Sequence, residues 1–125
     1  MNAIKDWQTT NNNDSRSVCK EYVGKIVLDK NNRLCEGEKH LPNGVVVRFV
    51  NGLIDGNVYD ENGMSILVRP AVQYKYGGQE FWTKGYPDGY PAVSQNMGHY
   101  EEDWTEGHII SVREEQEIED IEFFE

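Results

Sequence analysis

The sequence predicts an all-β protein, an antiparallel meander of repeated β-hairpins that ends in a short acidic C-terminal helix or tail. Apolar and aromatic stretches of about five residues recur along the chain, separated by Gly, Asn and Asp. A Trp-Thr-x-Gly motif occurs twice, and acidic residues dominate the C-terminal end. Strands this short at this turn spacing favour an antiparallel meander over alternating strands and helices.

The 125 residues suffice for one domain, which we expect to have three parts. Residues 1–17 are expected to form a flexible N-terminal arm, because residues 9–15 include no apolar side chain to bury. Residues 18–110 are predicted to form the β-repeat domain. Residues 111–125 are predicted to be the acidic helix or tail.

Each expected element has a local basis. Residues 22–28 are β-branched and aromatic and predict a strand, followed by an Asn/Asp turn at 29–32 and a short return strand at 33–35. Residues 45–50 form the clearest strand, and Asn51-Gly52 after it is a strong hairpin signal.

Further along, residues 60–63 resemble a calcium loop in outline but lack its ligand series, so a turn is expected before the strand at 64–68.

The last segment has two interpretations. Ser111 and Glu114 fit a capping box, and Ile118, Ile121 and Phe124 are spaced three apart, which favours a helix. The acids that continue to the end of the sequence repel one another and favour a frayed tail.

The internal repeat sets the architecture. Trp82-Thr83-Lys84-Gly85 recurs 22 residues later as Trp104-Thr105-Glu106-Gly107, and Pro70-Ala71-Val72 recurs 21 residues later as Pro91-Ala92-Val93. We align Glu80 with Glu101 and place the one-residue slip between Glu80 and Trp82, where a bulge would absorb it. A weaker third copy, residues 49–56, matches residues 82–89 at an offset of 33.

Residues 86–107 resemble repeats of the form Asp-Gly-Pro-Ala-Val…Gly…Trp-x-x-Gly. Such repeats occur in small proteins of phages and other mobile elements and are loosely similar to MORN repeats. The chain departs from the pattern at Tyr90, which is inserted before Pro91, and at Val68-Arg69, which replaces Asp-Gly before Pro70. The resemblance covers roughly residues 43–108. It implies a serial β-hairpin sheet and, by association, a phage-encoded interaction protein.

The net charge of −10 lies at one end of the chain. Residues 101–125 hold 11 acidic residues against one base, Arg113, whereas the first hundred residues hold 11 of each sign. This balance argues against direct binding to nucleic-acid phosphates and favours a basic protein partner. No apolar run approaches the ~20 residues of a membrane span, so we expect no membrane partner and a cytoplasmic location, in the host cell if the protein is phage-encoded.

The candidate partner-binding residues combine the acids and nearby aromatics. The acids could form a rigid anionic strip that imitates nucleic-acid phosphates, or they could form a solvated tail. The aromatics could form a binding platform, or they could be the core of the sheet. The candidates are Glu101, Glu102, Asp103, Glu106, Glu114, Glu115, Glu117, Glu119, Asp120, Trp82, Trp104 and Tyr100.

The residues that could carry metal or covalent chemistry do not form a recognisable motif. The three histidines and two cysteines lack metal-ligand spacing, although His99 and His108 would converge if adjacent hairpins paired them. Cys19 and Cys35 could pair in an oxidising compartment, but nothing indicates export, so free buried thiols are expected. We therefore expect no cofactor, no metal and no enzymatic activity.

These features predict an acidic interaction protein that binds and inhibits a basic nucleic-acid-binding or defence protein, as a nucleic-acid mimic. Two alternatives stay open. One is a small-ligand binder with an aromatic pocket, and the other is a structural component that self-associates into a homo-oligomer.

Overall fold

A computed structural model of the chain describes residues 3–4, 20–41, 44–75, 77–95 and 98–114. The described residues form short β-strands and one 3₁₀ helix, η1. None of them forms a helix with the length and hydropathy needed to cross a bilayer. The elements are β1 Ala3–Ile4, η1 Lys20–Tyr22, β2 Ile26–Val27, β3 Gly37–His40, β4 Val46–Val50, β5 Leu53–Ile54, β6 Val58–Tyr59, β7 Ser65–Leu67, β8 Val72–Gln73, β9 Gln79–Glu80, β10 Trp82–Thr83, β11 Tyr86–Pro87, β12 Gly89–Gln95, β13 Tyr100–Thr105 and β14 His108–Glu114.

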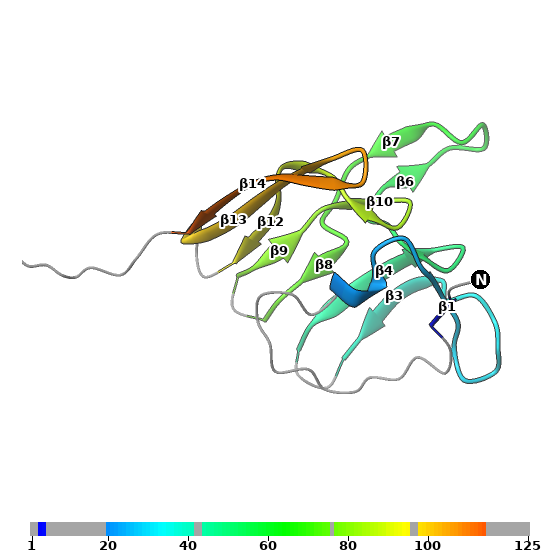
Figure 1. Cartoon of the computed structure of the whole chain (residues 1–125). Helices are drawn as coiled ribbons and strands as arrows, with labels where there is room; N and C mark the ends of the chain where they lie inside the picture. The colour runs from blue at the N-terminus through cyan, green and yellow to red at the C-terminus, as the bar shows by residue number, and fades with distance from the viewer. Residues whose placement is uncertain (1–2, 5–19, 42–43, 76, 96–97, 115–125) are drawn as a thin grey trace, which may run out of the picture.

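The main sheet follows the chain from one edge to the other (Figure 1). Its strand order is β14-β13-β12-β9-β8-β4-β3, with β5 paired to β4, and every neighbouring pair is antiparallel. The predicted antiparallel meander of hairpins is therefore confirmed. Two further hairpins, β6–β7 and β10–β11, pair outside this sheet.

Three two-residue turns mark the repeat. Each has positive φ at both central residues: Asn51 and Gly52 at 51° and 82°, Lys84 and Gly85 at 52° and 90°, and Glu106 and Gly107 at 51° and 82°. Positive φ at both positions is the geometry of the tight turn that matches the twist of a β-hairpin. The weak third copy inferred from the sequence thus has the same turn as the two stronger copies.

The register of the sheet corrects the alignment of the acidic residues. Val72 lies opposite Glu80, and the equivalent Val93 lies opposite Glu102 rather than Glu101. Glu80 and Trp82 therefore correspond to Glu102 and Trp104 at one constant offset, with no bulge between them. The one-residue slip lies earlier, in the turn, because Tyr74 bonds back to Gly78 whereas the next hairpin closes between Gln95 and Tyr100.

An insertion explains why the third copy has a different offset. After Asp88-Gly89 a single residue, Tyr90, precedes Pro91, but after Asp55-Gly56 residues 57–69 precede Pro70. Residues 57–69, which we call the inserted hairpin, contain β6 and β7 and leave and rejoin the sheet at one point. A Cβ on Gly56 would lie 2.1 Å from the carbonyl oxygen of Arg69, so only glycine allows the two ends to come this close. Asp55-Gly56, not Val68-Arg69, is thus the equivalent of Asp88-Gly89.

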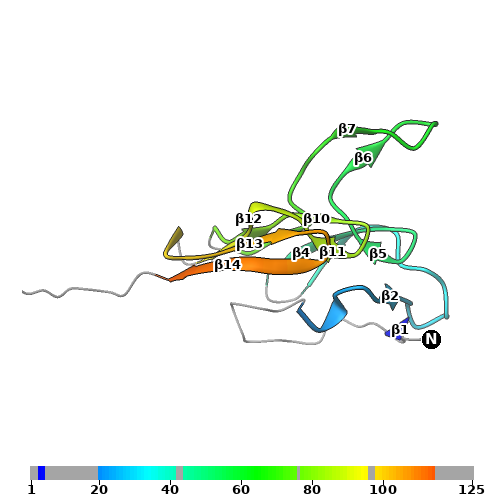
Figure 2. The ribbon, with the colours of Figure 1, turned by 45° about the horizontal axis from the view of Figure 1, so that its top comes forward.

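The two faces of the sheet carry different additions. The segment with η1 and β2 lies along one face, and the inserted hairpin rises from the other (Figure 2). Val23 from the η1–β2 segment packs against both core clusters. The amides of Gly24 and Val27 donate to the carbonyls of Gly85 and Gly52, so this segment is tied to the hairpin turns.

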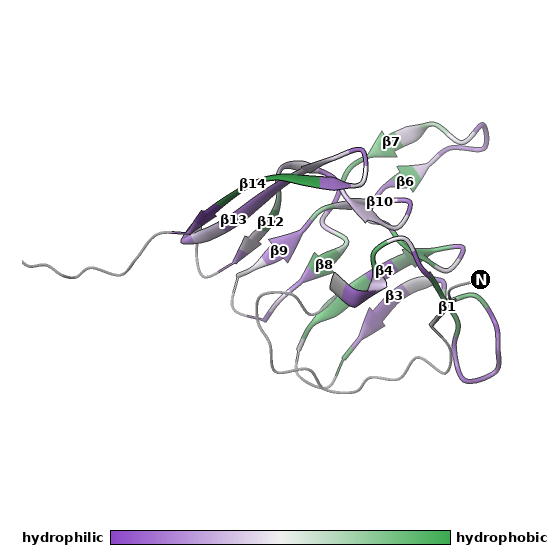
Figure 3. Ribbon diagram, viewed as in Figure 1, coloured by the Kyte–Doolittle hydropathy of each residue, from purple (hydrophilic) through white to green (hydrophobic). Residues whose placement is uncertain are grey.

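The core is a set of rows on the covered face. Val47, Val72, Glu80, Val93 and Glu102 lie in register across five strands, and all are buried. The aromatic residues Phe49, Trp82 and Trp104 follow Val47, Glu80 and Glu102 by two positions and are also buried. Apolar residues also occur outside this core, on β7 and β14 (Figure 3).

The predicted capping box is wrong, because Ser111 and Glu114 lie in β14 and not at a helix start. β-branched Ile109, Ile110 and Val112 favour a strand, and Arg113 lies opposite Glu101 in the adjacent β13. The sheet therefore extends to Glu114, past the boundary predicted at residue 110. Residues 115–125, with the rest of the predicted helix or tail, lie outside the described residues.

At the N-terminal end, the strand predicted over 22–28 is shorter, since Ile26–Val27 pairs in parallel with Ala3–Ile4 and Leu28 makes only an isolated bridge with Leu34. The turn at 29–32 and the return through Leu34 are present, with Asn32 at a φ of 63°. The remaining residues of the predicted N-terminal arm lie outside the described residues.

Candidate functional site

Glu102 and Trp104 do not lie on the surface. Glu102 is 2% exposed, and its carboxylate accepts hydrogen bonds from Trp104 Nε1 at 2.8 Å and from the hydroxyl of Tyr100. Trp104 is also buried, and Tyr100 is half-buried. Three of the predicted partner-binding residues thus form one internal hydrogen-bonded unit.

Glu80 and Trp82 form the same unit in the preceding copy. Trp82 Nε1 donates to Glu80 Oε1 at 2.8 Å, and the Tyr74 hydroxyl donates to Glu80 Oε2 at 2.5 Å. Trp82, another predicted binding residue, is 2% exposed. The side chains of both tryptophans belong to the core of the sheet, as one of the two sequence interpretations held.

Glu101 and Asp103 point to the opposite face from Glu102 and are held by Arg113. The guanidinium reaches Asp103 with both terminal nitrogens, at 2.7 and 3.0 Å, and Glu101 Oε1 at 3.0 Å. The hydrogen bond from Arg113 lowers the pKa of Asp103 below its usual value, and the same contacts raise the pKa of Arg113. Arg113, the single base of the C-terminal fifth, is therefore already engaged by two of its acids.

The remaining predicted acids lie further out. Glu106 is exposed in the turn between β13 and β14, and Glu114 is exposed at the end of β14. Glu115, Glu117, Glu119 and Asp120 lie outside the described residues. Residues 101–106 do not form the continuous anionic strip that was predicted. Glu102 lies in the core, Glu101 and Asp103 pair with Arg113, and Glu106 lies in a turn.

β14 is the last strand of the main sheet and pairs only with β13 among the described residues. Ile109, Ile110 and Val112 on this strand are 40%, 52% and 52% exposed. An edge strand with exposed apolar side chains offers unpaired backbone groups and apolar area to another chain. This edge leads directly into the acidic C-terminal residues.

The two histidines that pairing of adjacent hairpins could have brought together lie apart. His99 precedes β13 and His108 follows it, so the two lie at opposite ends of that strand. Within the described part of the chain, no group of three or more His, Cys, Asp or Glu side chains is arranged to hold a metal ion. Cys35 is buried and free, and burial raises the pKa of its thiol, whereas Cys19 lies outside the described residues.

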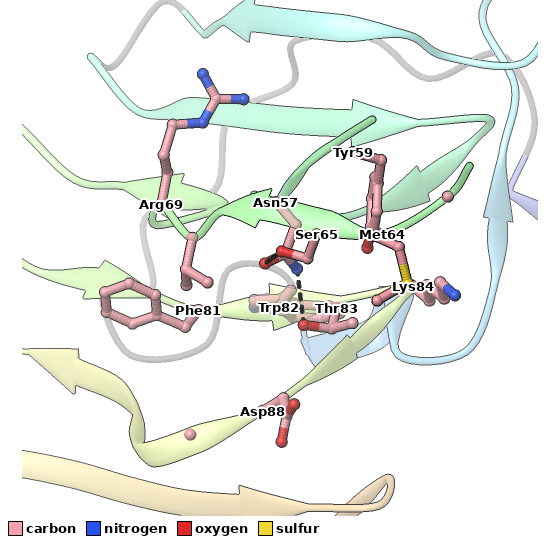
Figure 4. A pocket seen from close by; sticks show the side chains of 13 residues that line it. Asn57, Tyr59, Met64, Ser65, Arg69, Phe81, Trp82, Thr83, Lys84 and Asp88 are labelled. Carbon is pink, nitrogen blue, oxygen red and sulfur yellow. Dashed lines mark hydrogen bonds between the residues drawn. The ribbon is translucent and has the colours of Figure 1, made fainter. Parts of the chain in front are cut away.

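A polar network at the base of the inserted hairpin was not predicted from the sequence. Asp55, 1% exposed, accepts hydrogen bonds from the amide and side chain of Asn57, from the Tyr59 hydroxyl and from the Lys84 amide, at 2.6 to 3.1 Å. Burial and the bond to Asp55 raise the pKa of Tyr59 to about 12. Asn57 Nδ2 also donates to Thr83 Oγ1 at 2.9 Å, which links the inserted hairpin to β10 (Figure 4). The difference between the 33- and 21-residue offsets was the sequence signal for this insertion.

A groove of about 500 Å³ opens between the inserted hairpin and β10. Its walls include Tyr59 and Met64 from the inserted hairpin and Phe81 and Thr83 from the segment that follows β9 (Figure 4). The Lys84 ammonium lies 5.7 Å from the centre of the Tyr59 ring. The groove is therefore mixed in character, with aromatic, hydroxyl and cationic groups.

No protein-family model, curated protein or solved structure matches the chain.

Proposed function

We propose that this protein is a non-catalytic binding protein that recognises and inhibits a basic protein partner through its C-terminal edge. The observation that carries this proposal is the state of Arg113. Residues 101–125 contain 11 acids and this one base, and the base is held by Glu101 and Asp103. With its one base engaged by two of its acids, the segment keeps a large negative charge for a partner to meet.

The β14 edge supplies the second part of the recognition surface. A partner segment added to β14 would gain main-chain hydrogen bonds and cover Ile110 and Val112. Lysine or arginine side chains on that segment would meet the acids that follow β14 in the sequence. Apolar area gives such an interface its affinity, whereas charge gives it its selectivity and a fast association rate.

A nucleic-acid-binding or defence protein is the partner class that this chemistry favours. Such proteins carry basic surfaces that bind phosphates, and spaced carboxylates can occupy them in place of phosphates. The resemblance to repeats of phage proteins adds an association with inhibition of host proteins in the host cytoplasm. In this proposal the mimicry resides in the acids of residues 115–125, because Glu102 is buried and Glu101 and Asp103 are paired with Arg113.

The test is competition for duplex DNA. A panel of basic DNA-binding domains would be bound to labelled duplex, and the whole chain would be titrated against each at several salt concentrations. We expect displacement of DNA from at least one domain, with an affinity that falls as salt rises. A full-length variant in which the six acids of residues 115–125 become Gln or Asn should lose this competition.

The matched control moves the charge change elsewhere. The double variant Glu117→Gln/Glu119→Gln and the double variant Glu21→Gln/Glu61→Gln remove equal charge, and Glu21 and Glu61 are exposed outside the C-terminal edge. Only the first should weaken competition. If both double variants weakened competition equally, net charge alone would account for the interaction and the proposed site would be wrong. Full competition by the six-acid variant would also refute the proposal.

The groove beside the inserted hairpin supports a second candidate function, binding of a small ligand. Its volume and its aromatic and hydroxyl lining suit a small aromatic molecule. In a thermal-shift screen of metabolites, this function predicts a hit that is lost on Phe81→Ala and unaffected by removal of residues 115–125. A hit that depends on the C-terminal residues would contradict it.

A further inference from the structure

The inserted hairpin exposes several large apolar side chains. Four apolar side chains within five consecutive residues are between 52% and 66% exposed: Met64, Ile66, Leu67 and Val68. Several large apolar side chains exposed on one short segment indicate an interaction surface.

The base of the hairpin is firmly held. Arg69 Nε donates to the carbonyl of Gly56 at 3.0 Å, and Arg48 Nη1 donates to the carbonyl of Pro70 at 2.8 Å. The buried Asp55 network fixes the start of β6 from inside. These bonds tie both ends of the hairpin in place, and such preorganisation lowers the entropic cost of binding.

The hairpin is also incomplete as a sheet. β6 and β7 pair only with each other within the described residues, and two strands alone are marginally stable in water. The outer edge of β7 thus offers unpaired backbone groups beside Ile66 and Leu67.

We propose that a second copy of this chain covers the inserted hairpin. In this dimer β7 of one copy pairs antiparallel with β7 of the other about a two-fold axis, so the two hairpins form one four-stranded sheet. An antiparallel contact between identical strands is self-complementary, and this is the usual geometry of a homodimer. Ile66, Leu67 and Val68 of each copy then cover those of the other.

The charge distribution selects a second copy over a basic partner at this surface. Two chains of net charge −10 repel wherever their acidic ends meet. The inserted hairpin carries only Asp60 and Glu61 against Arg69, and it lies away from the C-terminal end of β14 in both views (Figures 1 and 2). A basic partner would bind at the acidic end instead. The nearly neutral apolar edge of β7 is then matched by the same edge of a second copy.

Salt separates this contact from the proposed partner binding. Added salt screens the repulsion between two acidic chains and does not weaken an apolar contact, so the dimer should strengthen as salt rises. Binding of a basic partner should weaken over the same range.

The experiment is sedimentation velocity of the whole chain under reducing conditions, at several protein concentrations and two salt concentrations. We expect a monomer–dimer equilibrium that shifts toward dimer at the higher salt. Ile66→Asp should raise the dimer dissociation constant by about tenfold or more. Because Ile66 is 64% exposed, its replacement should leave the circular dichroism spectrum unchanged.

The matched control is Ile110→Asp on β14, at a residue that is 52% exposed. This variant should dimerise as the unmodified chain does. A monomer at all concentrations and both salts would overturn the proposal, as would a dimer lost with Ile110→Asp and kept with Ile66→Asp. The six-acid variant leaves the inserted hairpin intact, so the dimer and the binding of a basic partner can each fail without the other.

Discussion

At the residue scale, the molecule's main device is a buried carboxylate paired with an indole. Glu80 and Glu102 occupy the position that Val47 holds in the first copy, and Trp82 and Trp104 occupy the position of Phe49. Phenylalanine has no N–H group, so the first copy needs no acceptor and has valine there. Where tryptophan replaces phenylalanine, its buried N–H requires a partner, and glutamate supplies one.

The first prediction follows from this pairing. Glu80→Val leaves Trp82 Nε1 without its acceptor, and Trp82→Phe removes a donor from a buried carboxylate, so each should destabilise the fold by roughly 1–3 kcal/mol. The double variant recreates the Val47–Phe49 arrangement and should cost less than the sum of the two. Urea unfolding of the four proteins measures the coupling, and strictly additive losses would refute the pairing.

Tyr59 gives the second prediction, which concerns alkaline pH. Its folded pKa of about 12 lies above the ordinary value near 10. A raised pKa means that the contribution of Tyr59 to stability is fully present below pH ~10 and is lost as pH rises toward 12. Tyr59→Phe should therefore make stability fall less steeply between these values in chemical unfolding. An unchanged slope in Tyr59→Phe would contradict this assignment.

At the element scale, the three tight turns show how far sequence preference guides the chain. Asn-Gly is the preferred pair for this turn, and the first copy has it. The other copies place Lys84 and Glu106 at the same left-handed position, where a non-glycine residue other than Asn or Asp is strained. The flanking strands hold these residues there, because the hairpins are packed into the sheet.

Relief of this strain is the third prediction. Lys84→Asn should raise the free energy of unfolding by about 0.5–1 kcal/mol, since Asn tolerates the left-handed region better than Lys. The amide that donates to Asp55 is kept in this variant. Lys84→Ala, which shortens the side chain without that tolerance, should give no gain in thermal unfolding experiments. A gain of the same size from both variants would assign the effect to lost charge.

In β14, by contrast, tertiary pairing overrides the local sequence preference. Ser111 to Glu114 satisfies a local helix-start pattern, yet these residues pair along β13. A capping box contributes hydrogen bonds only if a helix follows, whereas the strand gains a full ladder and the ion pairs of Arg113 with Glu101 and Asp103. Local pattern is overridden because the partner strand lies only a two-residue turn away.

At the scale of the whole molecule, the chain is a serial sheet with one insertion. The sheet carries the core, and the inserted hairpin contributes no buried apolar residue to either core cluster. The two strands proposed as contact surfaces, β7 and β14, contribute no residue to the two core clusters. Changes to these surfaces should therefore leave the core intact.

Removal of the insertion is the fourth prediction. A variant in which one tyrosine replaces residues 57–69 reproduces the Gly89-Tyr90-Pro91 connection and should keep the main sheet. Asp55 would lose Asn57 and Tyr59 and become exposed, as Asp88 is. We expect an unchanged β-type circular dichroism spectrum, cooperative thermal unfolding and loss of the dimer. Non-cooperative unfolding would show that the hairpin is part of the scaffold.

The sequence by itself determined the strand class, the turns and the repeat, because these depend on spacing and on local preferences of glycine, asparagine and β-branched residues. It also determined that the charge gathers at one end. Only the tertiary structure decided where each acid points. Adjacent residues of a strand face opposite sides, so Glu102 lies in the core while Glu101 and Asp103 meet Arg113. Which of the two glutamates faces the core depends on the register of β13 against β12. That register is set by the one extra residue in the turn before β13, and only the pairing of the two strands shows where this residue lies.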